Sequence, residues 1–221
     1  IRKGCHVASP HEGVDPVIMA AMVIMAGPTV VSRKINPLDP AILTFCTVHG
    51  GRASNIIPED VWLTGSIRTL DPEKRESLAN ELDRVARGVA RTGGGTCHLE
   101  VKPEYPSVFN HPELAAEFKE SAAKIVPADK VIDKQSPSMT GEDVAYFHQK
   151  VPGVHWLLGT ANPDLGFTHP LHSPLFDFNE EIMPLGAAIQ ACCAVDFLDN
   201  RQKKPLSPSS PPNPDNPVPD L

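Results

Sequence analysis

The sequence is poor in aromatic residues and carries no concentration of positive charge. Aromatic side chains make up 5% of its 221 residues, and its 20 Lys and Arg are outnumbered by 27 Asp and Glu, which gives a formal net charge of −7. The basic residues form no run or stripe that could neutralise successive phosphates. We therefore expect no nucleic-acid partner.

Long apolar runs are also lacking. A membrane-spanning helix needs about 20 predominantly apolar residues, and the longest candidate, 14–31, is interrupted by Asp15, Pro16, Gly27 and Pro28. The first residues lead directly into a polar segment, unlike the basic start and apolar core of a signal peptide. We expect no membrane partner, and the absence of an initiating Met suggests that the sequence begins within a longer protein.

Cysteine is scarce and scattered. The five residues, Cys5, Cys46, Cys97, Cys192 and Cys193, include one adjacent pair and no C-x-x-C spacing. This odd set fits neither a disulfide framework nor a structural zinc site. It indicates a reducing compartment, and we expect the protein to be cytoplasmic.

Proline, in contrast, is abundant, and 7 of the 24 prolines lie between positions 205 and 219. The Ser, Asn and Asp residues around them offer little apolar surface to bury. We expect residues 201–221 to form a disordered tail.

Residues 1–103 carry the pattern of a small α+β domain. Asp15-Pro16 and Asp71-Pro72 each predict the start of a helix, one over 17–25 and one that continues to the glycines at 93–95. Alternating or β-branched segments predict strands near 5–8 and over 41–48, 60–69 and 97–101. The resulting order β-α-β-β-α-β is that of a ferredoxin-like sandwich, so we predict the α/β class with an α+β domain first.

Residues 104–200 have a different rhythm. Apolar spacing predicts a helix from Pro112, a short helix over 142–149, a buried strand over 154–158 and a long helix over 181–198. So few elements would leave an open sheet with an unpaired edge and few covering helices. We therefore interpret this region as part of an α/β domain.

Three sets of residues could carry chemistry. His172, and to a lesser degree His169, lies in a proline-flanked loop and is either a metal ligand or a solvated loop residue. Glu142 and Asp143 stand at a predicted helix start, where capping is favoured over a role in a site. Arg68 lies on the exposed face of a predicted strand and is either solvated or placed to hold a carboxylate through two hydrogen bonds.

Five segments in a fixed order carry a resemblance to a known family. They are residues 4–11, 49–58, 65–69, 137–143 and 171–177. In these segments the sequence closely resembles the carboxyl-terminal half of the metal-dependent amidohydrolases related to hippurate hydrolase, N-acyl-amino-acid amidohydrolases and the plant indoleacetyl-amino-acid hydrolases. The resemblance covers residues 1–200.

The resemblance implies a fold and a reaction. Residues 1–103 would be a dimerisation or lid domain, and residues 104–200 would be the carboxyl-terminal part of a zinc-peptidase-like catalytic domain. The complete enzyme would be a homodimer joined through the lid, with a divalent metal pair of zinc, manganese or cobalt. It would cleave the amide bond of N-acyl amino acids, of acetyl, benzoyl or indoleacetyl type, to a carboxylic acid and an amino acid.

In the lid, the resemblance assigns roles to three residues. His6 would reach across the dimer to the partner's active site and help to stabilise the tetrahedral oxyanion. Asn55 and Arg68 would contact the substrate, Arg68 through the carboxylate of its amino-acid part.

In the second region, the resemblance makes His172 the last metal ligand and places Gly141 and Glu142 along the substrate site. The other metal ligands and the general base of the family lie in an amino-terminal portion that this sequence lacks. Because one ligand cannot hold two metals, we predict that the chain alone has no hydrolase activity. The alternative is a non-catalytic dimerisation or binding protein derived from that family.

Overall fold

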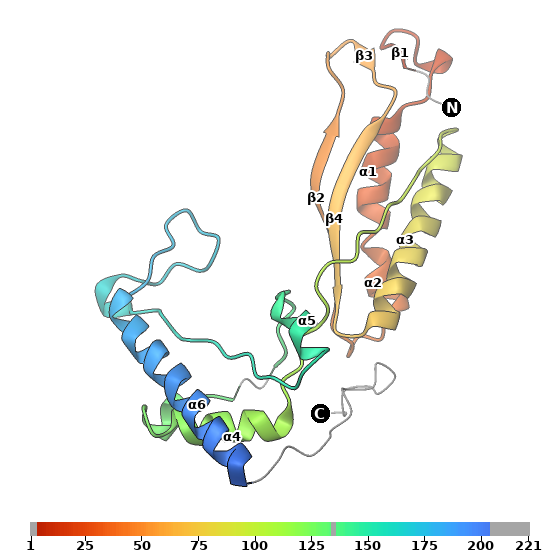
Figure 1. The fold of residues 1–221 in the computed structure, drawn as a ribbon. Helices are drawn as coiled ribbons and strands as arrows, with labels where there is room; N and C mark the ends of the chain where they lie inside the picture. The colour runs from red at the N-terminus through yellow and green to blue at the C-terminus, as the bar shows by residue number, and fades with distance from the viewer. Residues whose placement is uncertain (1–3, 134–135, 204–221) are drawn as a thin grey trace. The chain divides into compact units, whose positions relative to one another are not determined.

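The structure, a computed structural model, describes residues 4–133 and 136–203. The chain divides into two compact units, Ile1–Ser107 (unit 1) and Val108–Leu221 (unit 2), and Figure 1 colours it from the first unit to the second. The sequence placed this boundary after residue 103.

The first helix of unit 1 begins where the sequence predicts it. α1 (Pro16–Ala26) follows Asp15, whose Oδ1 accepts hydrogen bonds from the amides of Val17 at 2.9 Å and Ile18 at 3.3 Å. These bonds satisfy amides that have no partner inside the helix. The predicted break at Gly27 is also present, because α1 ends there and a separate short helix, α2 (Thr29–Lys34), follows.

Two long strands form an antiparallel hairpin. β2 (Ala41–Gly50) pairs with β4 (Val61–Thr69), and the register slips at a bulge between Phe45 and Thr47. The side chains of Thr47 and Thr64 face each other, with 2.6 Å between their Oγ1 atoms. Leu43 is buried whereas Trp62 is 67% exposed, so the hairpin has an inner and an outer face. The alternation places on the outer face Ile42, Thr44, Thr47, His49, Trp62, Thr64, Ser66 and Arg68.

Helices cover the inner face of this hairpin. α1 and α3 (Pro72–Thr92) contact each other and β4, and Figure 1 shows them as a second layer beside the strands. The buried residues of the two helices are Met19, Ala20, Val23, Leu78, Ala79, Leu82, Ala86 and Ala90. This two-layer contact is the core of unit 1.

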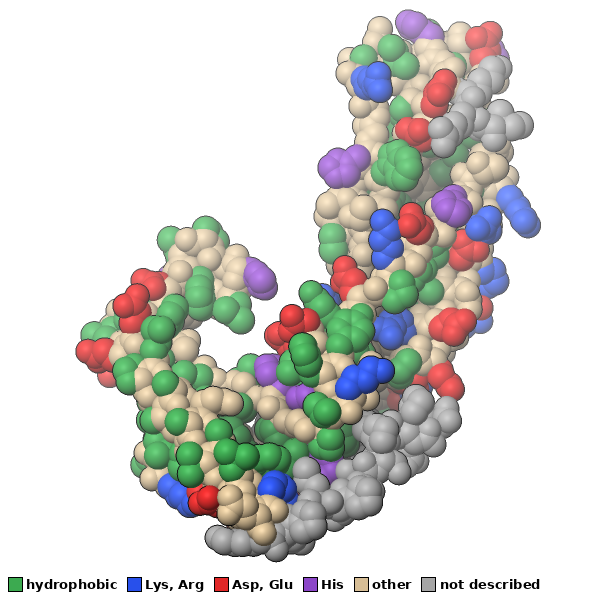
Figure 2. Space-filling model, in the orientation of Figure 1, with side chains coloured by type: hydrophobic (Ala, Val, Ile, Leu, Met, Phe, Trp, Pro, Cys, Tyr) green, Lys and Arg blue, Asp and Glu red, His purple; other side chains and the backbone are tan. Residues whose placement is uncertain are grey.

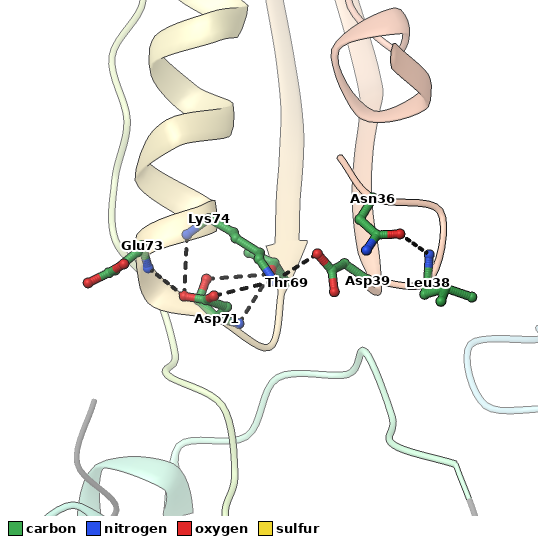
Figure 3. A network of polar contacts seen from close by, with 7 residues as sticks. All are labelled: Asn36, Leu38, Asp39, Thr69, Asp71, Glu73 and Lys74. Atoms are coloured by element: carbon green, nitrogen blue, oxygen red, sulfur yellow. Dashed lines mark hydrogen bonds and ion pairs between the residues drawn. The ribbon is translucent and has the colours of Figure 1, made fainter. Parts of the chain in front are cut away.

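The start of α3 is fixed by a polar network (Figure 3). Asp71 accepts hydrogen bonds from the amides of Glu73 at 2.9 Å and Lys74 at 3.4 Å, and its own amide donates to Thr69 Oγ1 at 3.1 Å. Lys74 also forms an ion pair of 2.8 Å with Asp39, and that hydrogen bond raises the pKa of the Lys74 ammonium. The network therefore joins the end of β4, the first turn of α3 and the loop before β2.

A second, very short sheet lies at the other end of the hairpin. β1 (Cys5–His6) pairs antiparallel with β3 (Ile56–Ile57), which belongs to the connection between β2 and β4. The strand near 5–8 is thus confirmed in part. β3 was not predicted, because two residues are too few to show a periodicity.

The predicted strand over 97–101 is wrong, and the four-stranded ferredoxin-like sheet is not formed by the described residues of unit 1. Its strands make two separate pairs, β1 with β3 and β2 with β4. Cys97 and Leu99 keep the predicted half-burial, but the segment runs back beside α3, where Tyr105 O accepts a hydrogen bond from Arg75 at 3.3 Å. Contact with a helix gives the burial pattern of a strand without the ladder of hydrogen bonds that defines one.

Unit 2 is built around two packed helices. α4 (Pro112–Ala122) begins at the predicted proline and buries Leu114 and Ala122. It packs against α6 (Met183–Lys203), to which it is tied by the Glu117–Arg201 ion pair at 2.6 Å. The turn after α4 adds a second ion pair, in which Lys124 Nζ lies 2.8 Å from both carboxylate oxygens of Asp196.

The predicted buried strand over 154–158 is also wrong. No strand is formed by the described residues of unit 2, and residues 154–156 are half-buried rather than buried. The Asn110 side chain takes the place of a neighbouring strand, because its Oδ1 accepts from the amide of His155 at 2.7 Å and its Nδ2 donates to the His155 carbonyl at 2.8 Å. A strand needs a partner, and a single side chain satisfies one residue only.

The predicted disordered tail starts too early. Arg201–Lys203 continue α6, and Arg201 is held by Glu117 and lies 4.8 Å above the ring of Phe197. The remainder of the predicted tail, 204–221, lies outside the described residues. The short helix predicted over 142–149 is present as α5 (Val144–His148).

Single helical turns complete the fold. They are Pro10–Glu12, Ala128–Lys130, Pro163–Leu165 and Glu180–Ile182. The last of them leads into α6, and the combined segment Glu180–Gln202 is the one described helix whose length and composition would allow it to cross a membrane, with a mean hydropathy of 1.4. Only 6% of its apolar window is buried within the described chain, and α6 carries the two ion pairs to the α4 region.

Unit 2 leaves many large apolar side chains open to solvent. Leu157 is 71% exposed, Phe147 66% and Leu198 62%, and Figure 2 shows hydrophobic side chains along α6. Burying a side chain of this size is worth about 1.5–3 kcal/mol. The unit therefore forgoes much of the apolar burial that normally stabilises an α/β domain.

Candidate functional site

Two of the residues assigned from the sequence lie together at one end of unit 1. His6 pairs with Ile56 in the β1–β3 sheet, and the amide of Val7 donates to the carbonyl of Asn55 at 3.0 Å. The side chains of His6 and Asn55 are both exposed. The short sheet therefore brings the backbones of His6 and Asn55 to neighbouring positions, and both side chains are open to solvent; we call this pair of residues the tip.

The imidazole of His6 is held by its own turn. The amide of Ala8 donates a hydrogen bond to His6 Nδ1 at 3.1 Å, and the amide of Ser9 donates to the His6 carbonyl at 2.9 Å. These bonds close a tight turn directly after β1. The ring is thus oriented through Nδ1, and Nε2 is the nitrogen left for a contact outside the turn.

Arg68 lies at the opposite end of the hairpin. It pairs with Ile42 on the outer face of β4, one residue before Thr69, which belongs to the polar network at the start of α3. Its side chain is exposed. The network holds the backbone on the carboxyl side of Arg68, and the pairing with Ile42 holds Arg68 itself. The side chain of Arg68 therefore extends from regular strand and not from a loop.

The distance between the tip and Arg68 follows from the register. Trp62 lies opposite His49 near the tip, and Arg68 is six residues further along β4. At about 3.3 Å per residue these six steps span roughly 20 Å. Figure 1 shows the β1–β3 pair beyond the end of the hairpin at which β4 begins. His6 and Asn55 are therefore together, but Arg68 is not with them.

In unit 2 the predicted site residues lie at the start of α5. Gly141 is half-buried and Glu142 is exposed, and the Glu142 carbonyl accepts from the amide of Ala145 at 3.2 Å. Asp143 occupies the N-cap position, but its side chain accepts no capping hydrogen bond. The capping role that the sequence favoured is therefore wrong for Asp143, because its backbone is already helical at φ −69° and ψ −24°, whereas a capping residue is normally extended.

His172 stands out by its backbone. It has a φ of +68°, in the left-handed region, and is the one non-glycine residue with a positive φ in the described parts of the chain. It belongs to a turn in which the amide of Ser173 donates to the Pro170 carbonyl at 3.1 Å, and its side chain is exposed. Histidine adopts this region more readily than most residues, but at a cost.

The described residues do not by themselves hold a metal. Nowhere in them do three or more His, Cys, Asp or Glu side chains come close enough together to bind an ion. A zinc site takes at least three protein ligands, so His172 is at most one member of a larger set. The donor set present does not fit a metal pair, and we derive no step through one.

Cysteine chemistry is also disfavoured at the positions where the pKa is shifted. Burial raises the pKa of the Cys97 and Cys193 thiols. A thiol is nucleophilic as its thiolate, which a raised pKa makes rarer. Neither residue is thereby suited to attack an amide carbonyl.

The sequence missed the backbone amide of Ala8 as a partner of His6. No residue type in the segment signals such a contact, because every residue except proline offers an amide. It also missed the separation of Arg68 from the tip, although the strand lengths and the alternation over 60–69 contain the information needed to estimate it.

Comparison with known proteins gives a family. The sequence profile described as Peptidase family M20/M25/M40 matches residues 2–196. The chain is 33% identical over 196 residues to thermostable carboxypeptidase 1 of Saccharolobus solfataricus, covering 88% of this chain and 49% of that protein. It is 38% identical over 187 residues to N-acetyldiaminopimelate deacetylase of Enterococcus faecalis, covering 83% and 47%. The chain thus spans about half the length of the curated relatives that it matches.

A solved structure agrees with these matches. The Bacillus subtilis YXEP protein, described as a dinuclear metal-binding peptidase of the M20 family, superposes with a TM-score of 0.59 at 27% identity. The match covers 84% of this chain and 47% of that protein. The two described units therefore correspond to about half of a larger molecule in the solved structure as well.

Proposed function

This chain belongs to peptidase family M20/M25/M40, and on that premise we propose that it is the carboxyl-terminal part of a homodimeric, metal-dependent amidohydrolase. The substrates are N-acyl amino acids of acetyl, benzoyl or indoleacetyl type, and the products are a carboxylic acid and an amino acid. Unit 1 is the lid and dimerisation domain, and unit 2 is part of the catalytic domain.

The separation of the tip from Arg68 is the observation that carries this proposal. In an N-acyl amino acid the scissile carbonyl and the carboxylate lie within about two extended residues of each other, roughly 7 Å, whereas the six steps of β4 alone span roughly 20 Å. β1, which carries His6, lies beyond the end of that strand (Figure 1), so we infer that His6 and Arg68 of one chain do not contact the same substrate. Both residues can be used if a second copy of the chain completes each site. His6 then acts in the partner's site, and Arg68 acts in the site of its own chain.

The residue types fit the roles in such a site. A guanidinium binds a carboxylate through two parallel hydrogen bonds, which suits Arg68 to the amino-acid end of the substrate. Amide hydrolysis passes through a tetrahedral intermediate whose oxygen gains negative charge, and an imidazole N–H from His6 can donate to it. Asn55, beside His6, would contact the substrate near the same bond.

Unit 2 supplies less to the chemistry. We assign His172 as one ligand of a divalent metal pair, zinc, manganese or cobalt, and Gly141 and Glu142 as lining residues. The remaining ligands and the general base would come from residues outside this chain. The exposed Phe147, Leu157 and Leu198 support this arrangement, because another half of the domain would cover them.

The first experiment supplies the missing half. The chain is joined to the amino-terminal half of the Enterococcus faecalis deacetylase, loaded with zinc, manganese or cobalt, and given acetyl, benzoyl and indoleacetyl amino acids. We expect the joined protein to release the amino acid, and the 221-residue chain and the isolated amino-terminal half each to release none. A folded, metal-loaded protein that is inactive on every substrate would contradict the proposal. The same assay on the protein purified from its natural source repeats the test without the artificial junction between two halves.

The second candidate is a dimeric binding protein without catalytic activity. The absence of a metal-binding cluster from the described residues favours it. The intact mass of the protein in its natural source separates the two: the hydrolase proposal expects a species much heavier than 23.9 kDa, and the binding protein expects a species of that mass.

A further inference from the structure

The turn that follows β1 places a hydrogen-bond donor against one nitrogen of His6. The Ala8 amide lies 3.1 Å from His6 Nδ1, and it is the donor because the lone pair of an amide nitrogen is delocalised into the carbonyl and accepts no hydrogen bond. The turn is itself anchored, since Ser9 donates to the His6 carbonyl at 2.9 Å and Val7 donates to Asn55 at 3.0 Å. Backbone bonds on both sides of Ala8 thus fix the direction of its N–H.

A neutral imidazole carries its proton on one nitrogen only, and the hydrogen bond made by the other nitrogen decides which. With Nδ1 as acceptor, the proton lies on Nε2. The alternative tautomer would bring an Nδ1–H against the Ala8 N–H, so that two donors would face each other.

We propose that the Ala8 amide is a positioning group that holds His6 as the Nε2–H tautomer and so turns its free nitrogen into a hydrogen-bond donor. This inference rests on the proposed function, in which His6 donates to the tetrahedral oxyanion. A pre-set donor needs no rearrangement when the charge develops, which is how such groups lower a barrier. His6 then acts as a neutral donor, and protonation of the ring is not required.

Ala8 is well suited to a test, because its side chain is exposed and its amide donates to His6 Nδ1. Ala8→Pro removes the N–H while leaving the residues that anchor the turn in place. Ala8→Ser keeps the N–H and is the matched control. The comparison therefore tests the loss of the N–H, and retention of the Val7–Asn55 hydrogen bond in Ala8→Pro shows that the turn itself is kept.

The readout is the tautomer itself. Ring ¹⁵N chemical shifts of the 221-residue chain are measured at alkaline pH, because the two tautomers are distinguished in the neutral imidazole. His6→Gln assigns the signals by their loss. We expect a protonated Nε2 and an unprotonated Nδ1 in the wild type and in Ala8→Ser, and a ratio of Nε2–H to Nδ1–H lowered about 2- to 10-fold in Ala8→Pro, as loss of one hydrogen bond would give.

An Nδ1–H tautomer in the wild type, or the same ratio in Ala8→Pro as in the wild type, would overturn the inference. If Ala8→Pro fails to fold, a through-hydrogen-bond coupling between the Ala8 amide and His6 Nδ1 in the wild type tests the same contact. Its absence from an otherwise assigned spectrum would also refute the proposal.

These outcomes are independent of whether the protein is a hydrolase. In the joined protein, the expected kinetic effect of Ala8→Pro is a lower kcat with little change in KM, because a donor to the oxyanion acts in the transition state. A changed tautomer with an unchanged kcat would reject the oxyanion role of His6 and leave the tautomer assignment standing. An unchanged tautomer would reject the role of Ala8, whatever the activity.

Discussion

The role of Arg68 can be tested by removing its charge and, separately, the charge of its proposed partner. Arg68 lies on the rigid outer face of β4, and the network of Thr69, Asp71 and Lys74 holds the strand end behind it. Arg68→Ala should therefore change the guanidinium and little of the sheet. Arg68→Lys is the matched variant, because it keeps a positive charge but loses the planar pair of donors.

The expected size of the effect follows from the type of bond. A hydrogen bond to a charged group is worth about 1.5–3 kcal/mol, and 1.4 kcal/mol is a factor of ten. The Arg68 side chain is exposed in the chain, so solvent screens it before substrate binds and the lower end of this range applies. We expect Arg68→Ala to lower kcat/KM about tenfold on a substrate with a free carboxylate, and Arg68→Lys to recover part of that loss.

The assay compares each N-acyl amino acid with its carboxamide in the joined protein. The wild type should prefer the acid, and Arg68→Ala should remove most of that preference, because the amide already lacks the negative charge. An equal loss on the acid and on the amide would show that Arg68 supports the fold or another contact, and would refute its assignment to the carboxylate.

Three further predictions concern the stability of the two units. Leu78 is 1% exposed in the core of unit 1, so a Leu78→Ala variant should lose about 2–5 kcal/mol of unfolding free energy in a denaturant titration, and a loss below 1 kcal/mol would place the core elsewhere. Asn110→Ala removes both bonds to the His155 backbone, and should make the His155 amide exchange its hydrogen faster than in the wild type. The hydrogen bond from Lys124 lowers the pKa of the Asp196 carboxyl below its ordinary 3.8. The stabilisation that this ion pair gives is therefore fully present above pH 3.8 and is lost as the pH falls through the lowered pKa. Asp196→Asn should remove this acid-dependent loss when the stability of unit 2 is measured against pH.

Local signals predicted the two long helices and the two long strands of unit 1, but not the sheet as a whole. The caps at Asp15 and Asp71 depend on a side chain and the next few amides, and both helices begin where those residues place them. The β2–β4 hairpin also follows from a short-range alternation. The strand over 97–101 failed for the opposite reason, since its alternation is real but a strand is defined by a distant partner that the pattern does not name.

The same limit applies to unit 2. Residues 154–158 carry the apolar run of a strand, but within the described chain they meet the side chain of Asn110 and not another strand. The end of α6 was missed because Arg201 is held by the distant Glu117. Composition favours disorder there, and a tertiary ion pair with a nearby ring overrides it.

For the candidate site, the sequence predicted which residues take part but not which of them lie close together in the fold. His6 and Asn55 are brought together by a β1–β3 pair that is too short to predict, whereas Arg68 is carried to the far end of the hairpin by nine residues of regular strand. The left-handed backbone of His172 was also invisible, because the Leu171-His172-Ser173 segment contains no glycine or asparagine that would signal it.

The proposed sharing of residues between the two subunits is tested most directly by mixing two impaired dimers of the joined protein, with the residual activity of each parent measured and subtracted. His6→Ala and Arg68→Ala are each purified, combined, and allowed to exchange subunits. If His6 serves the partner's site and Arg68 its own, half of the mixed population is heterodimer and one of its two sites contains both residues, so activity should return to about one quarter of the wild-type value in a two-fold symmetric dimer. No recovery, with subunit exchange confirmed by mass, would show that one site uses His6 and Arg68 of the same chain, and would contradict the account.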